Sequence, residues 1–281
     1  MSDRIDRRRE LKEAYIEELV ESTPTMSLTP LPDWFVREMF RAGLLVCGGP
    51  GTGKSNVSKV ILSQLIGGSI PDVQVKITDS AQIWIHGFEP IIYQHINEDT
   101  IFPNDIYLGD DHILYDLEFW DFDMVRDTIG NLVSTDYDIQ RLYKKEDLMD
   151  NHIVWCIEEA QNILGRYVLT GNSGKRWLKL ISEMRNFNIS FVWIGQRISD
   201  VATQAIERVQ NYLIGKSVGD NDLRKIQRIC GSDSGVHEMV PRLEVGQFIY
   251  WNGSQAYRVT DVPLYRPTTK PILWKYGMGV G

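Results

Sequence analysis

The sequence predicts an α/β fold in which helices cover both faces of a mostly parallel central sheet. Short apolar segments of strand length alternate along the chain with segments of helical periodicity, and this alternation is typical of doubly wound sheets. One segment, 153–157, is continuously apolar, as expected of a strand buried on both faces of a parallel sheet. The chain has 281 residues, 43% hydrophobic and 24% charged, which is ordinary for a globular protein.

The elements follow in order from the amino terminus. Helical spacing of apolar residues predicts a helix over 3–21, and three prolines indicate a linker over 22–33. Segments of strand character span 42–47, 73–78, 112–117, 153–157, 189–195 and 212–214. Helical periodicity spans 54–65, 121–145, 177–187 and 220–229. Strands at 248–250 and 256–259 flank Asn252-Gly253, a hairpin turn signal, whereas 91–111 is acidic and rich in turn residues.

The composition excludes several classes of protein. Apolar runs fall far short of the roughly 20 residues that span a bilayer, so we expect no membrane span. The first residues are charged and lack an apolar core, unlike a secretory signal. Cys47, Cys156 and Cys230 form no CxxC pair and are expected to be buried thiols in a reducing compartment. We therefore expect a cytoplasmic location.

Charge is distributed unevenly along the chain. The formal net charge of −8 argues against a protein that coats nucleic acid with its whole surface. Residues 72–127 include thirteen acidic and two basic side chains, whereas 166–228 includes eleven basic and five acidic ones. This asymmetry permits one basic face and one anion-repelling face, although solvated helix surfaces would also explain it.

A phosphate-binding loop lies between the first strand of the α/β region and the helix that follows. Its sequence fits GxxxxGK[ST], in the strand–loop–helix context that this motif requires. Backbone N–H groups and the helix amino terminus would bind the phosphates of ATP, with Lys54 near the β- and γ-phosphates and Ser55 on Mg²⁺. The predicted nucleotide-binding residues are Gly48, Gly49, Pro50, Gly51, Thr52, Gly53, Lys54, Ser55 and Asn56.

Two carboxylates follow the apolar strand 153–157. Glu158 is predicted to hold Mg²⁺ together with Ser55, and Glu159 is predicted to orient or deprotonate the attacking water. Acidic residues can also simply terminate a strand and cap the next helix. Beside a complete phosphate loop, hydrolysis of Mg²⁺–ATP is the favoured chemistry.

These and later motifs resemble the FtsK–HerA superfamily of P-loop ATPases that pump DNA. The similar residues occur in family order over 43–250. They are the phosphate loop, Asp79, Glu158-Glu159-Ala160-Gln161, the stretch from Arg185 to Gln196-Arg197, and the strand entry at Leu243. The resemblance implies a RecA/ASCE-type P-loop NTPase fold.

The resemblance also implies roles for residues beyond the phosphate loop. Gln196, at the end of a strand, would sense the γ-phosphate or hold the water. Arg185 would reach the nucleotide of the next subunit as an arginine finger, with Arg197 and Arg176 as alternatives. The sequence departs from the family pattern in having Glu158 for Asp, Gly195 for Thr and Asn188 for Gly.

The implied partners are double-stranded DNA and further copies of the chain in a hexameric ring. A short chain with one ATPase unit is most similar to viral genome-packaging ATPases, which implies a capsid or portal partner and a place in the host cytoplasm or virion. A HerA-type or conjugation-type pump with a nuclease partner, and a Zot-like phage assembly ATPase, stay open. An ATP-dependent switch or scaffold without translocation is the alternative of another class, and a small-molecule kinase is disfavoured.

Three regions are expected. Residues 1–33 form an amino-terminal helix and linker, and residues 34–262 form the P-loop ATPase motor domain. Residues 263–281, with prolines at 263, 267 and 271, form an extended arm that we expect to lie over a neighbouring subunit.

Overall fold

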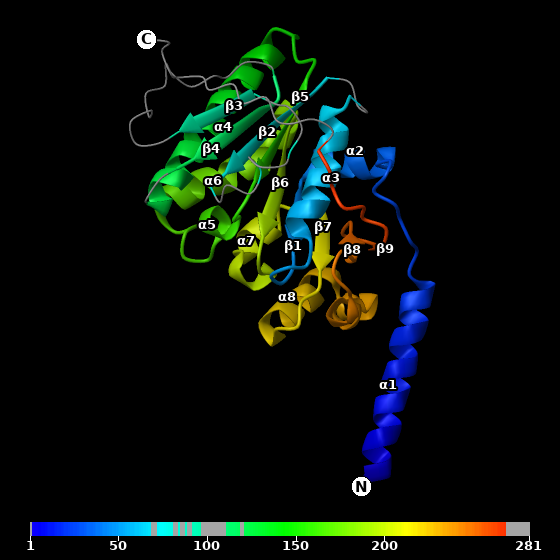
Figure 1. Ribbon diagram of the computed structural model, residues 1–281. Coiled ribbons are helices and arrows are strands. Elements are labelled where there is room, and N and C mark those ends of the chain that lie inside the picture. The colour runs from blue at the N-terminus through cyan, green and yellow to red at the C-terminus, as the bar shows by residue number, and fades with distance from the viewer. Residues whose placement is uncertain are drawn as a thin grey trace.

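The computed structural model describes residues 2–68, 72–80, 84, 88, 92–96, 111–118 and 121–267. Within these ranges, nine strands form one sheet in the order β3-β4-β2-β5-β6-β1-β7-β8-β9 (Figure 1). They are β1 (Leu44–Cys47), β2 (Val73–Asp79), β3 (Ile92–Ile96), β4 (Ile113–Leu117), β5 (His152–Ile157), β6 (Ile189–Gly195), β7 (Tyr212–Gly215), β8 (Phe248–Trp251) and β9 (Ala256–Val259). The seven strands from β3 to β7 in this order are parallel, and β8 and β9 are antiparallel.

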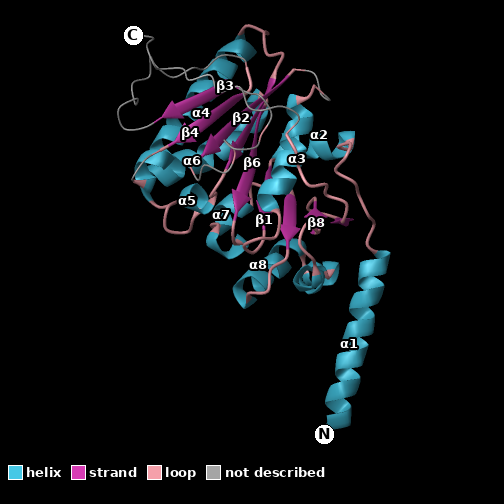
Figure 2. Ribbon diagram, viewed as in Figure 1, coloured by secondary structure: helices cyan, strands magenta, loops and turns pink. Residues whose placement is uncertain are grey.

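Helices alternate with the strands along the chain (Figure 2). They are α1 (Ser2–Ser22), α2 (Asp33–Ala42), α3 (Lys54–Ile66), α4 (Phe122–Lys145), α5 (Gln161–Leu164), α6 (Gly171–Glu183), α7 (Thr203–Ile206), α8 (Asp220–Cys230) and α9 (Val236–Met239). Short 3₁₀ turns add η3 (Met184–Phe187), η4 (Ile198–Asp200), η5 (Ser232–Ser234) and η6 (Val240–Arg242). The predicted mostly parallel α/β fold is confirmed.

The sheet separates two hydrophobic cores. Side chains alternate across a strand, so Trp155 of β5 lies in the core beneath α4–α9, while its neighbour Val154 lies in the core beneath α2 and α3. A buried ion pair joins α4 to β2 on the side of the sheet where Trp155 lies, with Lys76 Nζ 2.7 Å from Asp136 Oδ1. The Trp155 indole donates to the other oxygen of Asp136 at 2.9 Å. Because both charges are paired and hydrogen-bonded, this burial is tolerated and β5 is held in a fixed position.

The strand order places three loops side by side at one edge of the sheet. β6 lies between β1 and β5, and all three run parallel. Cys47 at the end of β1 is in register with Gly195 at the end of β6, and Ile157 of β5 is in register with Trp193. The residues that follow these strands therefore meet at the carboxyl edge, where ligands bind in open α/β sheets.

Two elements differ from expectation. No helix was expected over 33–42, but α2 forms there and buries Phe35, Val36 and Met39 against the sheet. No strand was expected within 91–111, but β3 forms at Ile92–Ile96 as an edge strand. A polar residue of β3 has a partner on the neighbouring strand, because the His95 ring lies 2.8 Å from a carboxylate oxygen of Asp116 on β4.

The linker and the terminal segments take different positions. The linker packs along β9, where Met26 N–H donates to Arg258 at 2.9 Å, and Leu28 is buried in the core. Helix α1 projects away from the domain, and it contacts α9 near its carboxyl end, where Ile16 is buried (Figure 1). None of the described helices combines the length and hydrophobicity needed to cross a lipid bilayer.

Candidate nucleotide-binding site

The phosphate-binding loop connects β1 to α3, as the sequence predicts. Gly51 and Gly53 have φ of 72° and 94°, a left-handed backbone that favours glycine and lets successive N–H groups turn toward one ligand. The loop is fixed from inside by the Thr52 hydroxyl, which donates to the Gly49 carbonyl at 2.9 Å. From outside, the Gly246 N–H donates to the Thr52 carbonyl at 3.1 Å. The cradle is therefore pre-organised.

Lys54 lies at the first turn of α3 and is half-buried. Its ammonium donates to the Gly49 carbonyl at 2.8 Å, so the side chain folds back across the loop. Burial lowers the pKa of Lys54, and the nearby carboxylates of Glu159 and Glu158 oppose this shift. Glu158 and Glu159 follow β5, and the phosphate-binding loop follows β1, so these residues lie at the same carboxyl edge of the sheet.

Glu158 is almost fully buried, with 6% of its surface exposed. Neither carboxylate oxygen has a partner in normal hydrogen-bond geometry among the described residues. Burial raises the pKa of Glu158 to about 7, although the Trp84 indole and Lys59 act in the opposite direction. A buried carboxylate with unused oxygens is suited to a cation. Together with the Ser55 hydroxyl it offers the hard oxygen ligands that Mg²⁺ prefers, so these residues fit the metal.

Glu159 is held in a strained backbone conformation. Its φ is 49°, in the left-handed region that a glutamate rarely adopts. Two side-chain amides bind its carboxylate: Gln196 Nε2 donates to Oε1 at 3.2 Å, and Gln161 Nε2 donates to Oε2. Strain of this kind costs about 1–3 kcal/mol and persists only where the surrounding structure over-determines it.

Asn56 has contacts other than the ligand predicted for it. Its side-chain amide donates to the Pro263 carbonyl at 2.9 Å, and its oxygen accepts from the Tyr265 N–H at 2.8 Å. This pair joins the beginning of the predicted arm to the phosphate-loop helix of the same chain. That the arm lies over a neighbouring subunit stays a prediction, and residues 268–281 lie outside the described residues.

The three candidate arginine fingers lie in different places. Arg185 is exposed in η3, before the amino end of β6, so the whole strand separates it from Gln196, about 20 Å at 3.3 Å per residue. Arg197 follows Gln196 at the nucleotide edge. Arg176 is bound to α4, where its guanidinium donates to the Ser134 hydroxyl at 2.7 Å. Within one chain, Arg185 does not reach its own loop.

Asp79 and Asn188 also take the positions that the motifs suggest. Asp79 ends β2 in a fully buried position and accepts from the Trp84 N–H at 2.8 Å. Asn188 has φ of 52°, which explains how asparagine replaces the glycine of the family pattern.

Two residues of the site were not assigned a role from sequence. Gln161 belongs to the quoted Glu-Glu-Ala-Gln stretch, but only the turn after β5 brings its amide back to Glu159. Lys59 lies one helical turn beyond Ser55 on α3, and Glu158 and Asp79 both influence its pKa, which burial lowers. The four-residue spacing from Ser55 is the signal that could have found it.

Similarity to known proteins appears at the level of structure. No protein-family model and no curated protein sequence matches the chain. The genome packaging NTPase B204 from Sulfolobus turreted icosahedral virus 2, in complex with AMPPCP, matches with TM-score 0.58 and 14% identity, over 80% of this chain and 100% of that chain. VirB4 of Thermoanaerobacter pseudethanolicus matches with TM-score 0.56 and 13% identity, over 77% and 88%. The pCW3 conjugation coupling protein TcpA, with ATPγS, matches with TM-score 0.51 and 14% identity, over 81% and 61%.

The chain therefore has the fold of P-loop ATPases. Its structural neighbours are of the FtsK–HerA type, in agreement with the resemblance drawn from the sequence motifs. At identities this low the similarity establishes the fold, and the roles of individual residues depend on the geometry described above.

Proposed function

We propose that this protein hydrolyses ATP and uses the energy to translocate double-stranded DNA, as a viral genome-packaging motor. The observation that carries the catalytic part is the position of Glu159. Its carboxylate is held by Gln196 and Gln161 at the sheet edge where Lys54 and the phosphate loop lie. A fixed carboxylate beside a phosphate cradle is the arrangement needed to activate water against a γ-phosphate.

Each residue of the site has a distinct task in this reaction. The loop N–H groups and Lys54 bind the phosphates and stabilise the charge that develops on them. Ser55 and Glu158 would hold Mg²⁺, which when bound neutralises charge on the β- and γ-phosphate oxygens. Glu159 orients the water and accepts its proton, while the amide of Gln196 keeps that carboxylate directed at the reacting phosphate.

The position of Arg185 supports a ring of subunits. An arginine at the amino edge of β6 has no access to its own nucleotide, but it can complete the site of an adjacent copy. We propose that six copies form a closed ring in which Arg185 acts in trans. A closed ring also avoids the open filament that a head-to-tail contact otherwise produces.

The DNA part of the proposal is supported by the neighbours and by the charge distribution. One structural neighbour is described as a genome packaging NTPase, and the basic residues of this acidic chain concentrate in 166–228. A capsid or portal protein would be the docking partner, and the motor would act in the host cytoplasm or at the virion. The neighbours VirB4 and TcpA favour a second candidate, a conjugation-type pump that acts with a nuclease.

The test is DNA-stimulated ATP hydrolysis by the purified protein. At low salt, double-stranded DNA should raise the steady-state rate several-fold, and the Lys54→Ala variant should lose both the basal and the stimulated rate. A rate of ATP hydrolysis that DNA does not change at any salt concentration would contradict translocation and favour a switch or scaffold. Translocation itself is measured by displacement of a third strand from a triplex, which only a moving motor achieves.

A further inference from the structure

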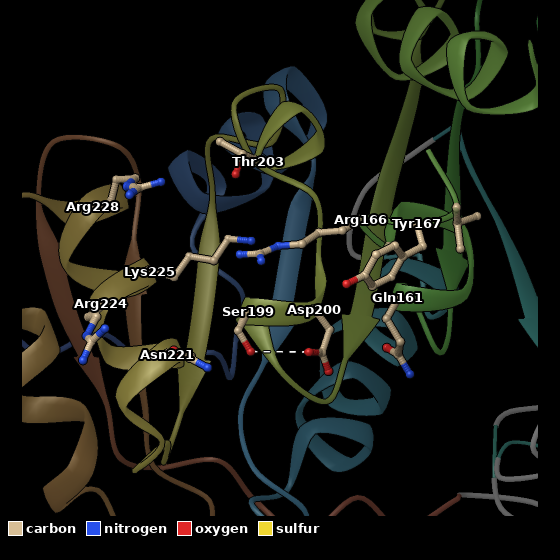
Figure 3. Close-up of a pocket in the computed structure, with 12 residues that line it drawn as sticks. Gln161, Arg166, Tyr167, Ser199, Asp200, Thr203, Asn221, Arg224, Lys225 and Arg228 are labelled. Atoms are coloured by element: carbon tan, nitrogen blue, oxygen red, sulfur yellow. Dashed lines mark hydrogen bonds between the residues drawn. The ribbon is translucent and has the colours of Figure 1, made fainter. Parts of the chain in front are cut away.

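A cavity of about 620 Å³ is lined in part by Gln161, close to the proposed catalytic site. It lies between the turn after α5, the η4–α7 segment and α8, and Gln161, which binds Glu159, is part of its wall (Figure 3). Its charged lining side chains are four cations and one carboxylate. They are Arg166, Arg224, Lys225, Arg228 and Asp200.

The cations of α8 share one face of the helix. Arg228 lies four positions after Arg224 and three after Lys225, so its side chain is a neighbour of both on the helix surface. Neither these three residues nor Arg166 forms an ion pair within the described part of the chain. Arg224 and Arg228 are like charges at a four-residue spacing, which destabilises an isolated helix.

Two of the cations face each other across the cavity. The head groups of Arg166 and Lys225 extend from opposite walls and meet near the middle (Figure 3). Lys225 is 8% exposed, and its ammonium donates to the Val201 carbonyl, which leaves further N–H donors. Burial lowers the pKa of Lys225 to about 8, and the positive charge of Arg166 lowers it further. An anion between these groups would remove their repulsion.

We propose that this cavity binds phosphate groups of a double-stranded DNA backbone, a role that rests on the proposed function. Guanidinium groups bind phosphates in a bidentate manner, and three of the four cations are arginines. The other surfaces of a chain with a net charge of −8 repel a polyanion on average, so DNA is directed to this part of the chain. Tyr167, 93% exposed at the rim, adds a side chain that can lie against a deoxyribose.

The position of Gln161 gives the cavity a link to catalysis. The same side chain contributes to the cavity wall and donates to Glu159, so an occupied cavity and the catalytic carboxylate share a neighbour. DNA bound here would be separated by the Gln161 side chain from the residue that we propose activates water. This proximity is a physical route by which DNA can alter the rate of hydrolysis.

The experiment compares two double variants that each remove two positive charges. Arg224→Gln with Arg228→Gln alters the cavity, whereas Arg141→Gln with Lys145→Gln alters exposed residues on α4 as a matched control. Anisotropy of a labelled DNA duplex is measured between about 50 and about 200 mM salt. Circular dichroism and melting temperature verify that every variant is folded.

The cavity variant should bind DNA at least about 10-fold more weakly at low salt. The magnitude of its slope of log affinity against log salt should fall by about 2, because each of the two lost phosphate contacts contributes about 0.9. The control pair should retain the wild-type slope and affinity. Inorganic phosphate at matched ionic strength should not displace the duplex from the wild-type protein.

Other outcomes would overturn the proposal. Equal affinity and slope in the two double variants would exclude the cavity as a DNA site, while DNA binding by the wild type would leave the proposed function intact. Loss of inorganic phosphate binding alone would assign the cavity to free phosphate. A change in sedimentation with unaltered DNA affinity would assign it to carboxylates of a second copy. Absence of DNA binding by the wild type would refute the proposed function together with the cavity's role.

Discussion

The amide of Gln196 donates to Glu159 at 3.2 Å, joining the residue after β6 to the second residue after β5. The two residues are 37 positions apart in sequence and meet because their strands are neighbours in the sheet. A glutamate fixed in this way can direct one oxygen at a water without the freedom to turn away.

Glu159→Gln should abolish turnover without abolishing ATP binding. The change keeps the shape of the side chain but removes the proton acceptor, which contributes about 10²–10⁴-fold to rate in comparable roles. We expect kcat to fall by at least about 100-fold while the Kd for ATP changes less than about threefold. Steady-state hydrolysis and equilibrium binding of a fluorescent ATP analogue measure the two quantities. Glu207→Gln, at an exposed position, is the matched control; wild-type turnover in Glu159→Gln would show that the base is elsewhere.

Gln196→Ala and Gln161→Ala should have separable effects. Gln196 follows the strand next to the phosphate loop, so its loss should lower kcat by about 10-fold or more with little change in KM. Gln161 faces the basic cavity, so its loss should chiefly change the ratio of DNA-stimulated to basal rate. Rates with and without DNA are compared for both variants. Identical effects on both rates would mean that the two amides act only as a common support for Glu159.

Arg185 should act only between subunits. Arg185→Ala keeps an intact phosphate loop, and Lys54→Ala keeps an intact Arg185, so each should be inactive alone. Because an arginine finger supplies about 10³–10⁵-fold in kcat, mixing the two should restore hydrolysis well above the sum of the separate rates. Arg176→Ala and Arg197→Ala, mixed with Lys54→Ala in the same way, test the alternative fingers. No recovery with Arg185→Ala, but recovery with another, would reassign the role.

Asn56→Ala should loosen the carboxyl-terminal segment. The variant loses the hydrogen bonds to Pro263 and Tyr265, worth about 0.5–1.5 kcal/mol each. We expect the free energy of unfolding to fall by about 1–2 kcal/mol, measured by chemical denaturation. Asn186→Ala, an exposed amide truncation in η3, should stay within about 0.5 kcal/mol of wild type. Equal stability of the two variants would mean that the tie to the segment contributes nothing.

Stability should fall in mild acid because of His152. Its ring stacks on Phe40 with centroids 3.9 Å apart, and burial lowers its pKa from 6.5 to about 4. The unfolded chain therefore takes up a proton first as pH falls. The contribution is fully present above about pH 6.5 and is lost progressively toward pH 4, up to about 3 kcal/mol.

The measurement for His152 is a difference between two proteins. The free energy of unfolding is determined between pH 7.5 and pH 4.5 for wild type and for His152→Phe, which keeps an aromatic ring but cannot titrate. The wild type should lose more stability than the variant over this range. Parallel pH profiles would refute the role of His152.

Much of the site could be predicted because its residues are local signals. The phosphate loop, the apolar strand before Glu158 and the strand before Gln196 are each short, contiguous patterns that specify backbone geometry. The ends of parallel neighbouring strands then necessarily meet at one edge. The expectation that Lys54 lies near Glu158 and Glu159 follows from these facts, and both carboxylates act on Lys54 electrostatically.

What escaped prediction depends on contacts between distant segments. Nothing near Asn56 indicates that Pro263, 207 positions away, accepts its amide proton. Helix α2 follows directly on a proline-rich linker, and the polar residues of β3 are explained only by Asp116 on the neighbouring strand. The basic segment was visible in the sequence, but the convergence of Arg166 from one turn with Lys225 from a helix required the tertiary fold.

The left-handed backbone at Glu159 has a consequence for protein engineering. Glycine or asparagine at this position would relieve the torsional penalty, whereas the native glutamate retains it. Random mutagenesis selected only for heat resistance would thus enrich for replacements at the carboxylate that we propose activates water. The thermostable variants selected in this way would lack ATPase activity. A selection for higher stability therefore has to measure ATP hydrolysis in the same round.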